Sequence, residues 1–259
     1  MNKVDLNLPI RAGTSLIGPL AILRMSSEEA VQLVRSSVQM SYPLDIAICN
    51  AHTTLTALDN PAFAETLRHM TLLNDGIGVD LASRFLNGKP FPDNLNGTDL
   101  IPDILTEVGF PLKIFLLGAT DRHVQLAKKH IETVYPMHHV VGARNGYFDL
   151  GECSHVCEQI NRARPDLLLV GMGNPRQEKF IVENRVRLNA TVAIGVGALF
   201  DFMSGSVVRA PKFVQSIGLE WLFRLLQEPR RLFRRYIIGI PRFFIALLKL
   251  KFGKSDTEN

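Results

Sequence analysis

Three segments of the chain combine glycine with polar side chains at points where an apolar run gives way to a helical pattern. They are residues 74–80, 171–179 and 195–201. Glycine lets a ligand approach the backbone, and the first amides of a helix favour phosphate. A glycine at a single strand–helix turn is more often structural. Three such loops in one chain predict a site for a nucleotide-type ligand.

Asp75 is the carboxylate best placed for proton transfer. It follows the apolar pair Leu72-Leu73 and precedes Gly76, so we expect it at a strand end, in the crevice where an open α/β sheet binds ligands. A carboxylate there could take a proton from an attacking hydroxyl. The alternative is a turn or cap aspartate before glycine, and the local sequence leaves both open. Weaker candidates are Asp80, Asp99 and Asp201.

The spacing of acidic residues, histidines and cysteines predicts no metal and no cofactor. Aspartates never occur as Asp-x-Asp, and no histidine pair has ligand spacing. We therefore expect basic side chains and backbone amides to stabilise a leaving phosphate. His52 is the one histidine that could line a pocket, although packing is the commoner role. The three cysteines form no disulfide framework, which favours a reducing compartment.

The positive charge of the chain is concentrated in residues 206–259, which carry 11 Lys/Arg and 4 Asp/Glu. On an ideal helix four of these arginines share one face, namely Arg224, Arg231, Arg235 and Arg242. Such a row beside aromatic and aliphatic residues suits an anionic lipid surface or a diphosphate group. The alternative is an amphipathic helix that packs on its own domain. Residues 243–248 are too apolar for nucleic-acid binding.

The sequence predicts a peripheral membrane protein. No apolar run reaches the roughly 18 residues that a membrane-spanning helix needs. The apolar run 16–23 is broken by Gly18 and Pro19, and no charged segment leads into an apolar one, so we expect no signal peptide.

The alternation of short apolar runs with helical patterns predicts a Rossmann-like, doubly wound, mostly parallel α/β sheet. Strands are expected at 44–49, 113–118, 140–142, 166–171 and 191–195, and helices at 26–40, from Asn60-Pro61, 98–108, 121–134, 152–164 and 174–187. Residues 1–205 would form the catalytic core. Residues 206–259 would form a helical, membrane-associating C-terminal appendage, divided into short helices by Pro229 and Pro241.

Several motifs, taken in order, resemble the WecG/TagA/CpsF family of bacterial glycosyltransferases (glycosyltransferase family 26). They are Asn74-Asp75-Gly76-Ile77-Gly78, Gly97-Thr98-Asp99-Leu100, Gly171-x-Gly173-x-Pro175-x-Gln177-Glu178-Lys179, Gly195-Val196-Gly197-Ala198-x-Phe200-Asp201, Arg209-Ala210-Pro211, and the run from Gly218 to Arg231. The similarity covers roughly residues 15–245.

The resemblance implies an inverting, metal-independent hexosyltransferase that uses a UDP-sugar donor and a polyprenyl-diphosphate-linked acceptor at the cytoplasmic face of the inner membrane. Asp75 would be the general base. The appendage arginines Arg224, Arg231 and Arg234 would close over the donor diphosphate. A homo-oligomer away from the membrane is also implied. The donor site would include Asn50, Gly76, Gly78, Gly171, Gly173, Asn174, Gln177, Gly195, Gly197 and Asp201.

Two positions depart from the pattern of the teichoic-acid members of that family. Ile48 stands where they carry a pocket threonine, and Asn94 stands where they carry an arginine. Losing a hydroxyl and a guanidinium changes the hydrogen bonds available to the sugar or diphosphate. A glucosyl donor, used by some relatives in exopolysaccharide assembly, therefore competes with N-acetylmannosamine.

Two other functions fit the same residues. One is a soluble nucleotide-dependent sugar enzyme, such as an epimerase or dehydrogenase; the absence of a dinucleotide fingerprint argues against it. The other is a non-catalytic scaffold that recruits polysaccharide enzymes to the membrane.

Overall fold

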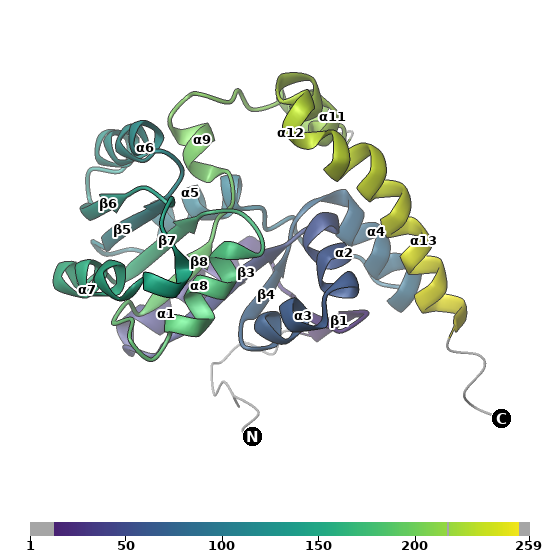
Figure 1. Cartoon of the computed structure of the whole chain (residues 1–259), viewed down its shortest axis with the longest axis horizontal. Helices are drawn as coiled ribbons and strands as arrows, with labels where there is room; N and C mark the ends of the chain where they lie inside the picture. Colours follow the sequence, from purple (N-terminus) through teal and green to yellow (C-terminus); the bar gives the residue numbers. More distant parts are fainter. Residues whose placement is uncertain (1–12, 217, 254–259) are drawn as a thin grey trace.

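The computed structural model describes residues 13–216 and 218–253, which form an eight-stranded sheet with helices on both faces (Figure 1). The order across the sheet is β1-β2-β4-β3-β8-β7-β5-β6. All neighbours pair in parallel except β1 and β2, which form a hairpin. The strands are β1 (Gly13–Ile17), β2 (Leu20–Arg24), β3 (Leu44–Cys49), β4 (Thr71–Asn74), β5 (Lys113–Gly118), β6 (His139–Arg144), β7 (Leu167–Gly171) and β8 (Val192–Gly195).

Side chains alternate between two hydrophobic clusters along each strand, as the period of a β-strand requires. In β3, for example, Ile46 and Ile48 belong to one cluster, whereas Ala47 and Cys49 belong to the other. Both faces of the sheet are therefore buried, which explains why the strands read as continuous apolar runs.

Ten helices of the described chain contribute buried residues to these two clusters. One face is covered by α1 (Ser27–Gln39), α5 (Gly97–Glu107), α6 (Asp121–Val134) and α9 (Leu199–Met203). The other is covered by α2 (Ala51–Asp59), α3 (Pro61–Arg68), α4 (Gly76–Asn87), α7 (Ser154–Ala163), α8 (Arg176–Asn184) and α13 (Gly239–Phe252). This arrangement confirms the doubly wound α/β prediction.

Local capping explains where several helices begin. Ser26 and Glu29 form the predicted capping box at α1, and Asn60 caps α3 with Pro61 in its first turn. The helix expected at 174–187 begins later, because Asn174 does not cap it. Pro175 precedes α8, and the Asn174 side chain instead donates to Glu178 Oε1.

The appendage contains α10 (Lys212–Ser216), α11 (Glu220–Gln227), α12 (Pro229–Phe233), a π-helical turn η2 (Arg234–Ile238) and α13. Pro229 begins a helix as predicted, but the prediction that Pro241 divides the segment is wrong. Helical structure runs from Pro229 through to Phe252, with Pro241 in the first turn of α13. The π turn directly before it widens the helix where the proline ring would otherwise meet a carbonyl.

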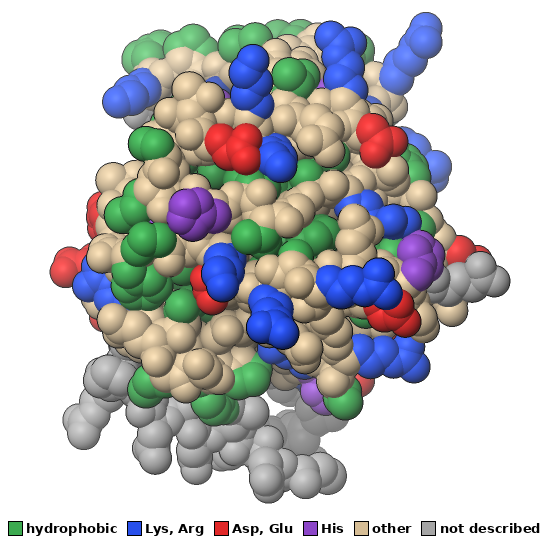
Figure 2. All heavy atoms as spheres, turned by 90° about the vertical axis from the view of Figure 1, so that its left-hand side faces the viewer, with side chains coloured by type: hydrophobic (Ala, Val, Ile, Leu, Met, Phe, Trp, Pro, Cys, Tyr) green, Lys and Arg blue, Asp and Glu red, His purple; other side chains and the backbone are tan. Residues whose placement is uncertain are grey.

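α13 packs against the α2 and α4 side of the sheet, and its Phe243 and Leu247 are buried in that cluster. Hydrophobic side chains, with Lys and Arg among them, gather along the upper margin of Figure 2, at the height of α11 and α12 in Figure 1. Within residues 13–216 and 218–253, no helix combines the length and the apolar character needed to cross a membrane. The division at residue 205 stays a prediction.

Candidate active site at the carboxyl edge of the sheet

The carboxyl ends of the parallel strands lie along one edge of the sheet. β3 lies at its centre, between β4 and β8, and the chain continues from β3 to β4 on one side while β7 and β5 lie on the other. Such a switch in direction leaves a crevice between the loops that follow the strands. All three glycine-containing loops predicted from the sequence leave this edge.

Asn50 and Asp75 follow the neighbouring strands β3 and β4. Asn50 caps α2, because its Oδ1 accepts from the amides of His52 and Thr53, both at 3.1 Å. Its Nδ2 remains free to donate to Asp75 Oδ2 at 3.2 Å. Asp75 precedes α4, but its side chain makes no cap hydrogen bond. Asp75 thus occupies the N-cap position of α4 without using its carboxylate as a cap, and its role as a general base stays a prediction.

The surroundings of Asp75 tune its acidity. Burial raises the pKa of its carboxyl, while the Asn50 hydrogen bond and the charges of Arg235 and Arg224 oppose that rise. Burial, followed by the nearby Arg235, lowers the pKa of His52 to about 4, so this imidazole is neutral at physiological pH. A carboxylate with a raised pKa is a better proton acceptor near neutrality than an ordinary aspartate.

Gln177 joins the loops after β7 and β8. Its Oε1 accepts from the backbone amides of Gly173 and Gly197, both at 3.1 Å, and its Nε2 donates to Glu178 Oε1 at 2.8 Å. The Gln177 side chain is only 2% exposed. It therefore holds two predicted donor-binding loops together, a role that the sequence did not indicate.

Glu178 holds the Gln177 side chain in place by accepting a hydrogen bond from it. It is fully buried, its Oε1 accepts from Gln177 and Asn174, and burial raises the pKa of its carboxyl to about 7. Glu178 was not predicted to be a functional residue. Both partners of Glu178 are near it in sequence, but nothing in the local pattern shows that this carboxyl is buried beneath the loop.

Four of the predicted glycines, Gly171, Gly173, Gly195 and Gly197, lie in or next to these two loops. Gly171 and Gly195 end β7 and β8, and a Cβ at Gly195 would lie 2.8 Å from Gln177 Nε2. Gly173 has a φ of 75°, in the left-handed region that favours glycine. Gly76 and Gly197 also have positive φ. Gly76 and Gly78 lie in the first turn of α4, after β4, where Gly78 approaches Ala51.

Asp201 connects the core to the appendage. Its Oδ1 lies 3.1 Å from His123 Nδ1, and its Oδ2 lies 3.4 Å from Arg231, which also pairs with Glu228 at 2.8 Å. A pocket of about 350 Å³ opens beside these groups. Its lining residues are His123, Asp201, Ser206, Val207, Gln227, Glu228 and Arg231.

Arg209 makes a second connection of this kind. Its guanidinium donates two hydrogen bonds to Asp99, at 2.6 and 2.5 Å, and its Nε lies 3.9 Å from Glu220. Although burial raises the pKa of Asp99, the hydrogen bonds from Arg209 and Asn96 hold it below its ordinary range. Asp99 is therefore charged and engaged with the appendage, not a free catalytic base.

The appendage arginines differ in their surroundings. Arg224 stacks over Phe202 at 5.0 Å and lies 3.7 Å from Glu228, and Arg235 stacks over Tyr236 at 5.5 Å. The positive charges of Arg224 and Arg235 both lower the pKa of Asp75. Arg234, in contrast, is exposed. The roles expected for Arg224, Arg231 and Arg234 on a diphosphate stay predictions, and Arg235 joins them as a site residue.

Ile48 and Asn94 both lie close to the crevice. Ile48 is almost fully buried at the end of β3, and its Cδ1 lies 3.3 Å from where a Cβ on Gly97 would stand. Asn94 Oδ1 accepts from the amide of Gly76 at 2.7 Å, directly after Asp75. The Asn94 side chain thus fixes the start of α4, a contact that an arginine could not make because it has no acceptor.

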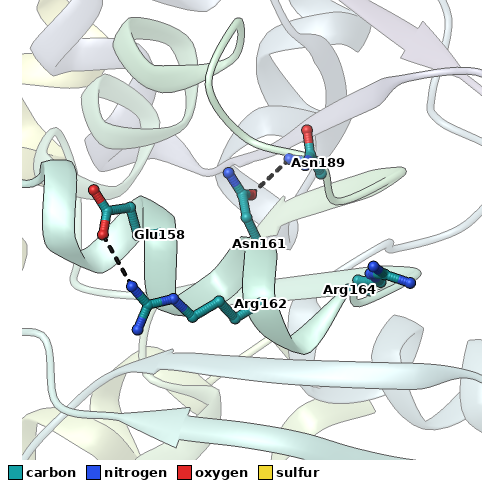
Figure 3. A pocket seen from close by; sticks show the side chains of 5 residues that line it. All are labelled: Glu158, Asn161, Arg162, Arg164 and Asn189. Carbon is teal, nitrogen blue, oxygen red and sulfur yellow. Dashed lines mark hydrogen bonds and ion pairs between the residues drawn. The ribbon is translucent and has the colours of Figure 1, made fainter.

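A second hollow, of about 520 Å³, lies away from the crevice (Figure 3). Arg164 and Asn189 line it just before β7 and β8 begin, so it lies at the amino edge of the sheet. Its side chains mainly bind one another. Glu158 pairs with Arg162 at 3.4 Å, and Asn161 accepts from the amide of Asn189 at 2.9 Å. It contains no predicted site residue.

The described part of the chain offers no evident metal site. No group of three or more His, Cys, Asp or Glu side chains there is arranged to hold an ion. The three cysteines, Cys49, Cys153 and Cys157, are free and buried.

Comparison with known proteins adds direct evidence of kinship. A family model described as "Glycosyl transferase WecG/TagA/CpsF family" matches residues 16–257. Three similar proteins are named N-acetylglucosaminyldiphosphoundecaprenol N-acetyl-beta-D-mannosaminyltransferase. Those of Bacillus spizizenii (strain W23) and Bacillus subtilis (strain 168) are 32% and 33% identical over 79% of this chain and 78% of theirs. That of Staphylococcus aureus (strain MW2) is 32% identical over 84% of this chain and 85% of its own. The chain therefore belongs to the WecG/TagA/CpsF family of glycosyltransferases.

Proposed function

We propose that this enzyme transfers a hexosyl residue from a UDP-sugar to a polyprenyl-diphosphate-linked saccharide during the synthesis of a bacterial exopolysaccharide or cell-surface polysaccharide. The observation that carries the proposal is the partly buried carboxylate of Asp75 at the carboxyl edge of the sheet, with Arg224 and Arg235 close enough to act on its charge. The names of the relatives, which specify a diphosphoundecaprenol-linked acceptor, support the acceptor class.

In the proposed reaction Asp75 accepts the proton of an acceptor hydroxyl. The freed oxygen attacks the anomeric carbon of the donor, a new C–O bond forms, and the bond from that carbon to the diphosphate breaks with its electron pair leaving on UDP. A single displacement of this kind inverts the anomeric configuration. The guanidinium groups of Arg224, Arg231 and Arg235 would offset the charge that builds on the diphosphate, without requiring a metal ion.

Two donor sugars fit the proposed function. The relatives are named as N-acetylmannosaminyltransferases, which favours an N-acetylmannosamine donor. Ile48 and Asn94 favour glucose, because neither supplies the hydroxyl or guanidinium of the teichoic-acid members. We therefore propose a hexosyl donor of one of these two types.

We further propose that the protein works as a peripheral protein on the cytoplasmic face of the inner membrane. The exposed apolar side chains of the appendage, including Phe213, Leu226 and Phe233, alternate with basic ones. Such a surface suits the boundary of a bilayer with anionic lipids. A homo-oligomer away from the membrane would shield the same apolar surface from water.

The test is to incubate the purified protein with UDP-glucose or UDP-N-acetylmannosamine and a polyprenyl-diphosphate-linked saccharide, with mass spectrometry of the lipid product. We expect product from one donor and a loss of about 10²- to 10⁴-fold in kcat for Asp75→Asn. An Asp75→Asn enzyme as fast as the wild type would contradict the proposed base. No product from a folded protein that still binds anionic vesicles would favour the scaffold alternative.

A further inference from the structure

Helix α4 leads directly away from Asp75 and carries an exposed apolar row. Ile77, Leu81 and Phe85 are 51%, 41% and 39% exposed. Their spacing of four residues places them on one side of the helix, while Val79, Ala82 and Ser83 are buried against the sheet. The row starts two residues after Asp75 and extends about 12 Å along the helix.

Helix α13 carries a matching row. Phe244, Leu248 and Phe252 are 42%, 50% and 64% exposed and also recur every four residues. Phe243 and Leu247, which lie next to this row in sequence, are buried. Thus neither row is needed for the packing of the hydrophobic core.

The two helices run side by side in the same direction (Figure 1). Near the site, a Cβ on Gly78 of α4 would lie 3.8 Å from the ring of Phe243. At the far end, the rings of Phe85 and Phe252 lie 6.4 Å apart, and Lys251 donates to the carbonyl of Phe85 at 2.9 Å. The two apolar rows therefore border one seam, which we call the α4–α13 seam.

Both helices begin at the candidate active site. Asp75 directly precedes α4, and Arg235 lies in the π turn that directly precedes α13. Asp75 and Arg235 thus lie at the same end of the seam, and beyond them the two helices present exposed hydrocarbon. A polyprenyl-diphosphate-linked saccharide likewise carries its sugar hydroxyls and its anionic diphosphate at one end and a hydrocarbon chain at the other, which matches a carboxylate and a guanidinium group at one end of an apolar seam.

We propose that the α4–α13 seam binds the first part of the polyprenyl chain of the acceptor and so directs the acceptor sugar toward Asp75. The inference rests on the proposed function, because it needs a lipid-linked acceptor. It makes the core helix α4, together with the appendage, a determinant of acceptor recognition. Apolar burial is the driving force, and it grows with the length of hydrocarbon covered.

The experiment compares two acceptors with the same saccharide diphosphate, one on an undecaprenyl chain and one on a two-isoprene chain, both in detergent. We expect the wild type to have a KM at least about tenfold lower for the long chain, since more hydrocarbon is buried. We expect Leu81→Gln/Phe85→Gln to lose this preference. Glutamine is a good helix former, so the change at exposed positions of α4 preserves the helix.

The matched control is Leu126→Gln/Val134→Gln, which changes two exposed apolar residues of α6 on the other face of the sheet. It should keep the chain-length preference. Equal KM values for the two acceptors in the wild type would overturn the inference without any use of a variant. A Leu81→Gln/Phe85→Gln protein that keeps the preference but no longer binds phospholipid vesicles would also overturn it, in favour of the bilayer as the occupant. Failure of the wild type to transfer sugar to either acceptor would instead reject the proposed function.

Discussion

Asn50 Nδ2 donates a hydrogen bond to Asp75 Oδ2 across the ends of β3 and β4, at 3.2 Å. The same asparagine uses its Oδ1 to cap α2. The orientation of the amide is therefore set by the helix cap, and the cap in turn aims a donor at the carboxylate. A hydrogen bond to the charged form of an acid favours that form, so Asn50 limits the rise in the pKa of Asp75 that burial causes.

Asn50→Ala should both weaken the fold and change the pH dependence of transfer. Loss of the cap costs about 1 kcal/mol of stability. Loss of the hydrogen bond raises the pKa of Asp75, so Asp75 stays protonated to a higher pH. The acidic limb of kcat/KM should therefore move to higher pH, as measured by initial rates across a pH series.

Asn60→Ala is the matched control, because Asn60 caps α3 through the amides of Ala62 and Phe63 at 3.1 and 3.2 Å. We expect a similar loss of stability with no shift of the pH profile. If both variants shift the profile equally, the effect comes from stability and the role assigned to Asn50 is wrong.

Arg235→Gln should move the same acidic limb in the same direction. The charge of Arg235 lowers the pKa of both Asp75 and His52. Its removal leaves Asp75 protonated to higher pH. Arg234→Gln should leave the limb in place, because Arg234 is exposed and does not act on the pKa of Asp75. A shift with Arg234→Gln and none with Arg235→Gln would reverse this assignment.

The sheet and its ligand-binding edge were predictable from the sequence, because both depend on local pattern. Apolar runs predicted the central strands, and glycine-containing loops indicated the carboxyl edge. The β1–β2 hairpin was missed, because its turn at Gly18-Pro19 interrupts one apolar run that reads as a single segment. Helix α4 was missed as well, since Gly76 and Gly78 have low helix propensity and its stability comes from packing.

The contacts within the site were less predictable, because they join residues far apart in sequence. Gln177 bridges to Gly197, and Arg209 pairs with Asp99, more than a hundred residues away. Nothing in the local sequence of either residue specifies its partner. The arginine row pointed to Arg235, whereas only the folded chain brings that residue close to Asp75.

Gln177→Leu should loosen the two donor-binding loops. It leaves the amides of Gly173 and Gly197 without an acceptor, at a cost of about 1–3 kcal/mol for each buried group. We expect a higher KM for the UDP-sugar and faster hydrogen exchange at both amides. Gln227→Leu is a suitable comparison, since Gln227 makes two hydrogen bonds to the backbone of Val208 instead. Unchanged exchange at Gly173 and Gly197 in Gln177→Leu would show that the bridge is not what orders the loops.

Ile48→Thr should alter the choice of donor sugar. The position lies near the carboxyl end of β3, where the Ile48 side chain approaches Gly97, and a threonine there adds a hydroxyl beside the crevice. We expect kcat/KM for UDP-N-acetylmannosamine to rise relative to that for UDP-glucose. Ile48→Val is the control, because valine has the shape of threonine without the hydroxyl. An identical change of the donor ratio in both variants would assign the effect to the lost methylene group.

Deletion of residues 206–259 should release the protein from anionic vesicles and remove its activity. The deletion removes the 11 basic residues and the exposed apolar side chains that we expect to contact lipid. It also removes Phe243 and Leu247 from the hydrophobic cluster, at about 1.5–3 kcal/mol each. We therefore expect a lower Tm for the remaining α/β core, which should still unfold cooperatively.

Vesicle sedimentation at rising salt measures how much charge contributes to membrane binding, because screening weakens the attraction of basic residues to anionic lipid. Vesicle binding by the truncated chain equal to that of the full chain would place the membrane contact in the core, and the salt dependence would then have to come from its residues.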